Sequence, residues 1–251
     1  NNTQGYGAFV NCADSMDVIT LINCHLVNSS IITPNNGADE SRIGGLVGWT
    51  AGYGNPNDGP VDSYITIEGC SVTGCTLKGA GSIGAICGHA GANKATFTTI
   101  KNCTITGNKL ISTDDGGWRT GVVVGTANVG EVTISNITES GNTLTQTGKT
   151  APTGYLRNYY GRFVPGTTGK LTIDGYKVVA EGKLEDAEGN TIATNVAGLK
   201  DALKEGEDVI LADDMAIKSS ESESNSYGKT GINMTNGGTI DGGGNDISIN
   251  A

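Results

Sequence analysis

Apolar and polar residues alternate in short segments that recur along the chain. The segment ITIEGC at 65–70 returns as TTIKNC at 98–103 and VTISNI at 132–137, and an earlier copy, ITLINC, covers 19–24. A period of two is typical of a strand that buries one face. We therefore predict strands stacked in register, with inward columns formed by Leu21, Ile67, Ile100 and Ile134, and by Cys24, Cys70, Cys103 and Ile137.

The position just before the cysteine column holds only Asn or Gly. These residue types tolerate a left-handed backbone, so the position predicts a one-residue corner formed by Asn23, Gly69, Asn102 and Asn136. Cysteine packs as a small hydrophobe, and strands about 4.8 Å apart hold stacked cysteines in an awkward geometry for bridging. The pattern therefore favours buried thiols over disulfides.

A second repeat alternates with the first. IGGLVG at 43–48 returns as IGAICG at 83–88 and TGVVVG at 120–125, in a chain with 40 glycines among 251 residues. We interpret the glycines as residues of many tight turns. Two alternating repeats at variable spacing indicate a solenoid whose loops absorb the differences. The expected fold class is all-β, a parallel β-helix.

These residues carry a family resemblance over roughly 5–175. The GGLVG and GVVVG segments resemble the GLUG-type glycine-rich repeats of bacterial surface adhesins and secreted peptidases. The corner asparagines and stacked Ile, Val and Cys columns are similar to the right-handed parallel β-helix of the pectate-lyase-like superfamily. The C-terminal region resembles secreted or surface proteins of Bacteroidetes. The resemblance implies a right-handed coil and a secreted or bacterial cell-surface location.

The pattern divides the chain into β-helix coils at 1–175, a hairpin or linker at 176–194, and a last segment at 195–251. Asn195 is a plausible N-cap of one short amphipathic helix that ends before Gly206, and such a helix normally caps the first coil of a β-helix. Ile210 and Ile240 are 30 residues apart, and counting on through Ala251 and Asn1 reaches Ile19 after 30 more.

This continuity predicts that 195–251 forms coils that stack on the coil at residue 1. The segment would fold back within its own chain, complete a neighbouring molecule, or belong to one unit of a tandem array. The alternative is a coincidence of glycine-rich coils.

Charge and composition exclude some functions. The net charge of -10 argues against nucleic acid as a partner, and we find no apolar run long enough to span a bilayer. The first residues lack the features of a signal peptide, so we expect a mature, soluble product. The six cysteines include no CxxC pair and only two histidines accompany them, so we expect no zinc site.

Candidate chemistry is sparse. Asp114, Asp115 and Arg119 offer an acid pair with a guanidinium, as glycoside hydrolysis needs, but neighbouring acids in DDGG are also typical of a solvated turn. Loop acids could hold Ca²⁺, although no spaced DxDxDG pattern occurs, and no other cofactor is expected. The aromatic residues Trp49, Tyr53 and Trp118 would either stack on sugar rings or cover a glycine-rich loop.

The sequence favours a secreted or cell-surface structural protein that associates with itself end to end into a filament or array. The alternatives are a polysaccharide lyase or glycoside hydrolase of the β-helix superfamily and a carbohydrate-binding adhesin module. Whether the chain is an enzyme stays open, with a non-enzymatic role favoured.

Overall fold

The computed structural model describes residues 4–13, 18–33, 41–51, 62–113, 118–149, 155–218, 223–224, 230–232 and 236–250. The chain divides into two compact units: unit 1 comprises 1–152 and 157–174, and unit 2 comprises 153–156 and 175–251. The fold is a β-solenoid with mostly parallel strands, 55% strand and 6% helix, and one short α-helix in the described part of the chain. The predicted fold class is confirmed.

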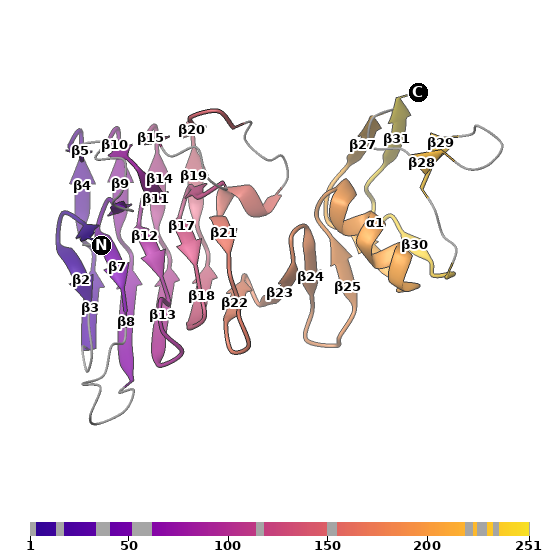
Figure 1. Ribbon diagram of the computed structural model, residues 1–251, viewed down its shortest axis with the longest axis horizontal. Coiled ribbons are helices and arrows are strands. Elements are labelled where there is room, and N and C mark those ends of the chain that lie inside the picture. The colour runs from indigo at the N-terminus through magenta and orange to yellow at the C-terminus, as the bar shows by residue number, and fades with distance from the viewer. Residues whose placement is uncertain are drawn as a thin grey trace. The chain divides into compact units, whose positions relative to one another are not determined.

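Unit 1 is a stack of coils (Figure 1). The first coil contains β1 (Gln4–Tyr6), β2 (Val10–Ala13), β3 (Val18–Ile22), β4 (His25–Val27) and β5 (Ser30–Ile32). The second contains β6 (Ser41–Gly44), β7 (Val47–Thr50), β8 (Ser63–Glu68), β9 (Ser71–Thr73) and β10 (Thr76–Gly79). The third contains β11 (Gly81–Gly84), β12 (Cys87–Ala90), β13 (Thr96–Lys101), β14 (Thr104–Thr106) and β15 (Lys109–Ser112). The fourth contains β16 (Thr120–Gly121), β17 (Val124–Ala127), β18 (Glu131–Ser135), β19 (Thr138–Ser140) and β20 (Thr143–Gln146). After the 3-10 helix η1 (Tyr155–Asn158), the fifth coil contains β21 (Tyr160–Phe163) and β22 (Lys170–Ile173).

Corresponding strands of successive coils pair in parallel, so each full coil adds one strand to each of five sheets. In the sheet that contains β3, β8, β13, β18 and β22, the side chains of alternate residues point inward. One inward column contains Leu21, Ile67, Ile100, Ile134 and Ile173. The members of this column in the second to fifth coils are fully buried. These columns form the core.

The glycines of the second repeat bring two sheets together, a role that the interpretation as turn residues does not include. A Cβ added to Gly88 would lie 2.5 Å from the backbone nitrogen of Ile43, and one added to Gly125 would lie 2.4 Å from that of Ile83. Neither glycine has a positive φ. The sheets of β6 and β12 therefore pack backbone against backbone, and only residues without a side chain permit this approach.

The glycine-packed strands fill the interior of unit 1. Gly45 and Leu46, which join β6 to β7, are buried, and a Cβ on Gly45 would lie 3.1 Å from both methyl groups of Val72 in β9. In the third coil every residue from 81 to 90 is buried. The second repeat thus forms an inner layer of the coil, covered by the outer strands.

Unit 2 contains both antiparallel and parallel pairs. Its described elements are β23 (Tyr176–Ala180), β24 (Lys183–Glu185), β25 (Thr191–Ala193), α1 (Val196–Glu205), β26 (Val209–Leu211), β27 (Met215–Lys218), β28 (Glu223–Ser224), β29 (Thr230–Gly231), β30 (Ile240–Asp241) and β31 (Ile247–Asn250). β24 pairs antiparallel with β23 and β25, whereas β25, β26 and β30 run parallel, as do β27 and β31. The stretch assigned to a hairpin or linker is therefore folded as strands of unit 2.

The helix of unit 2 begins and ends at the predicted residues. The Asn195 side chain accepts a hydrogen bond from the Gly198 N–H at 2.8 Å, and Gly206 adopts the left-handed conformation with φ of 78°. The strand register differs from the prediction by one residue, because Val209, not Ile210, pairs with Ile240. The coil length here is thus 31 residues.

Candidate functional site

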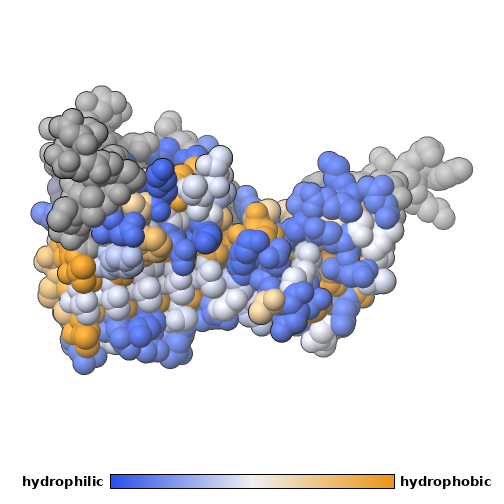
Figure 2. Space-filling model, turned by 90° about the horizontal axis from the view of Figure 1, so that it is seen from below, coloured by the Kyte–Doolittle hydropathy of each residue, from blue (hydrophilic) through white to orange (hydrophobic). Residues whose placement is uncertain are grey.

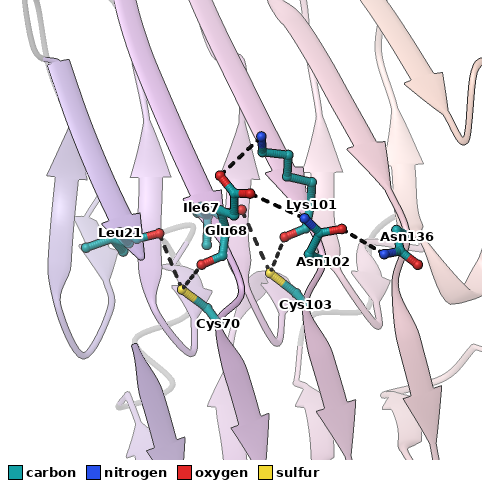
Figure 3. A network of polar contacts seen from close by, with 8 residues as sticks. All are labelled: Leu21, Ile67, Glu68, Cys70, Lys101, Asn102, Cys103 and Asn136. Atoms are coloured by element: carbon teal, nitrogen blue, oxygen red, sulfur yellow. Dashed lines mark hydrogen bonds and ion pairs between the residues drawn. The ribbon is translucent and has the colours of Figure 1, made fainter. Parts of the chain in front are cut away.

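The predicted corner residues share a left-handed backbone. Asn23, Gly69, Asn102 and Asn136 have φ between 50° and 63°. The amide of Asn136 donates to the side-chain oxygen of Asn102 at 2.7 Å, and the amide of Asn102 donates to Glu68 at 3.3 Å (Figure 3). The corner therefore also carries a ladder of side-chain hydrogen bonds along the solenoid axis.

The cysteine column lies directly inside this corner. The Cys70 thiol donates to the Glu68 and Leu21 carbonyl oxygens at 3.3 and 3.4 Å (Figure 3). The Cys103 thiol makes the equivalent bond to the Lys101 carbonyl oxygen at 3.3 Å. Burial raises the pKa of Cys103 to about 11, so the thiol stays protonated. The column acts as packing and as a weak hydrogen-bond donor to the corner carbonyls.

A second corner, which the sequence reasoning missed, lies five residues after the first in every full coil. It is formed by the left-handed residues Asn28, Gly74, Gly107 and Gly141. Asn108, fully buried behind it, accepts from the Cys75 N–H at 2.8 Å and donates to the Val72 carbonyl at 2.8 Å and to Asn142 at 2.9 Å. An Asn or Gly follows the first corner residue by five positions in every full coil, and this constant spacing could have predicted the second corner.

The predicted catalytic group is only partly described. Asp114 and Asp115 lie outside the described residues, as does Tyr53. Arg119 lies near His89, whose pKa is lowered to about 3 by burial and by the positive charges of Arg42, Arg119 and Arg162. The enzymatic hypothesis therefore stays a prediction.

The two predicted sugar-contact tryptophans contact the protein itself. The Arg42 guanidinium carbon lies 3.9 Å from the centroid of the Trp49 ring system, and the Trp118 indole N–H donates to the Thr120 carbonyl at 2.7 Å. Both tryptophans are half-buried. Sugar binding and the covering of a glycine-rich loop both stay predictions.

The first coil, which we call the head, exposes the core of unit 1. Ile19, Leu21, Leu26 and Ile31 are only half-buried, although the residues that pair with them in the second coil are at most 1% exposed. Phe9 is 49% exposed, although its counterparts at the same position of the next three coils are fully buried. Figure 2 shows apolar residues gathered at this end of unit 1.

The described residues of the head carry no strong charge, and Asp14 and Asp17 lie outside them. Residues 4–13 and 18–33 contain no Asp, Glu, Lys or Arg, whereas 17% of the whole chain is charged. Edge strands that face water are usually protected by charged side chains. Charged residues are instead depleted in the centres of protein interfaces. The described part of the head has the composition of an interface.

One of these columns ends in a polar residue. The inward column of Leu26, Val72 and Ile105 ends in Glu139, which accepts from the Asn142 amide at 3.1 Å. The other columns end in apolar residues that are at most 8% exposed, namely Leu144, Leu171 and Ile173. The apolar columns are therefore covered at this end, whereas they are only half-buried in the first coil.

Within the described ranges, we find no group of three His, Cys, Asp or Glu side chains placed to share a metal ion. None of the helices described is long and apolar enough to cross a membrane.

The coil geometry and its columns define the chain as a β-solenoid repeat protein. Comparison with models of known protein families, with curated proteins and with solved structures gives no match.

Proposed function

We propose that this protein is a secreted or cell-surface structural solenoid that associates with further copies of itself through the head. The observation that carries the proposal is the half-buried apolar surface of the first coil, whose described residues include no Asp, Glu, Lys or Arg and whose counterparts in the next coils are buried. Repeat proteins need polar terminal repeats to stay soluble as separate molecules. The head lacks charged groups in its described residues and would be covered by a partner.

The remaining surface suits this role. The net charge of -10 disfavours sideways aggregation, while the apolar head permits association along the axis. In keeping with the resemblance of the repeats, we place the protein among GLUG-like β-helices of the pectate-lyase-like kind, made by a Bacteroidetes-like bacterium. The surface role follows from that placement.

Light-scattering mass at increasing protein concentration tests the proposal. We expect the mass to rise well above the 25.6 kDa of one chain. The variant Leu21→Lys places a charge on the half-buried inward face of the head and should remain a monomer, because a charge buried without a partner is costly.

The matched control is Val18→Lys in the same strand. Val18 is 76% exposed on the outward face of β3, so this variant should associate like the original protein. A monomer at every concentration of the original protein would refute the proposal.

A further inference from the structure

The last described coil of unit 2, which we call the tail, also ends in unpaired strand edges. β30 pairs with β26 and β31 pairs with β27, and within the described residues neither has a second neighbour. Ile240 and Ile247 are only partly buried against the core cluster of unit 2. The tail therefore exposes apolar side chains beside a free edge, as the head does.

An aspartate contact joins successive coils of unit 2. The Asp214 carboxylate accepts a hydrogen bond from the backbone N–H of Asp246 at 2.8 Å. The pairing of Met215 with Ile247 places Asp246 one coil beyond Asp214 at the same position. The Asp246 residue is exposed, and in the part of the chain that the structure describes its carboxylate has no partner. This carboxylate is placed to accept an N–H from a following coil.

We infer that the head is covered by the tail of a second copy, with β30 lying parallel to β3. The inference rests on the proposed function and names the partner surface. Ile240 would extend the inward column that begins with Ile19, and Asp246 would accept a backbone N–H at the free edge of the head. Within each unit, each later parallel strand is added beyond the preceding one. A tail-to-head contact continues that order with the two strands at the contact parallel.

A second copy is the partner that the strand order favours, because its tail would add the next parallel strand at the edge of the head. A contact between two different surfaces of identical molecules builds a ring when the rotation between copies closes and an open filament when it does not. Tail-to-head contacts that continue the solenoid axis from copy to copy build a filament.

Mixing two blocked variants tests the inference. The head-blocked variant is Leu21→Lys, and the tail-blocked variant is Ile240→Lys. Each alone should be a monomer in sedimentation velocity. An equimolar mixture should form a dimer of twice the monomer mass and nothing larger, because only one competent tail and one competent head can meet.

A second variant of each surface is used if circular dichroism shows that the first one is unfolded. Leu26→Lys then replaces Leu21→Lys in the head. Asp246→Lys, at an exposed residue, replaces Ile240→Lys in the tail. Ser248→Lys, on an exposed position of β31, is the matched control and should leave filaments intact.

The outcomes separate the two proposals. If the tail-blocked variant alone formed dimers, and mixing it with the head-blocked variant did not increase the amount of dimer, the heads would be pairing with each other. That result would overturn the tail-to-head inference and keep self-association through the head. Filaments that persist in both blocked variants would overturn both.

Discussion

Replacing Gly84 by Ala tests the packing of the two inner sheets. The added Cβ would lie 2.3 Å from the Cys87 carbonyl oxygen, 2.6 Å from the Gly125 nitrogen and 2.7 Å from the Val123 oxygen. All three contacts are with backbone, so relief requires a shift of strands in two coils rather than of one side chain. Overpacking a well-filled core costs about 1–3 kcal/mol and occasionally more. We expect a loss of about 3 kcal/mol in the free energy of unfolding of unit 1.

Gly107→Ala is the matched control because its cost has a different origin. A Cβ at Gly107 meets nothing within 4 Å, but the residue has φ of 67°. A non-glycine residue in that region costs about 1–2 kcal/mol. We expect Gly84→Ala to be the more destabilising of the two by about 1–2 kcal/mol.

Tryptophan fluorescence during urea unfolding measures the difference. Both tryptophans of the chain, Trp49 and Trp118, belong to unit 1, so the signal reports that unit alone. A Gly84→Ala variant as stable as Gly107→Ala would refute the close packing of the glycine strands.

Three further predictions concern buried polar groups. Asn108→Ala should destabilise unit 1 by about 2–3 kcal/mol in urea unfolding, because it leaves the Cys75 N–H and the Val72 carbonyl without this side-chain partner. An effect below about 0.5 kcal/mol would contradict a stabilising role of the Asn108 hydrogen bonds. The pKa of His89 is lowered from 6.5 to about 3 in the folded protein. Between these two pH values the unfolded chain binds a proton at His89 that the folded chain does not bind. The free energy of unfolding should therefore fall by up to about 1.4 kcal/mol for each pH unit that the pH is lowered in this range. His89→Gln should remove this part of the slope in thermal melts across pH, and an unchanged slope would count against a buried neutral imidazole. Burial raises the pKa of Cys87 to about 12, whereas Cys12 is exposed. A thiol reagent should therefore label Cys12 in the folded protein and Cys87 only after unfolding. Equal labelling rates of the two thiols, measured by mass spectrometry, would contradict the buried inner layer.

The outer strands could be predicted from sequence because stacked coils repeat their chemistry in register. Each coil places an inward Ile or Leu two residues before an Asn or Gly corner, and the paired strands align these positions. The inner sheets could not be inferred in the same way. Gly84 and Gly88 read as turn residues because glycine is the usual residue of turns, whereas here it permits contact between two backbones.

Unit 2 gave a weaker pattern for a physical reason. Its parallel strands are short, and β26 and β30 are not followed by a one-residue corner that would fix the register. In strands this short, few side chains distinguish the correct register from one shifted by a residue. The sequence pattern therefore aligns Ile210 with Ile240, whereas Val209 is the residue that pairs with it. The polar cap formed by Glu139 was also hidden, because its inward position follows from pairing with Ile105.

If the head joins the tail of another copy, negative-stain electron microscopy of the unmodified protein will show long, unbranched fibres. These fibres should disappear in Leu21→Lys and remain in Val18→Lys. Separate particles of single-chain size at all concentrations would refute assembly through the head.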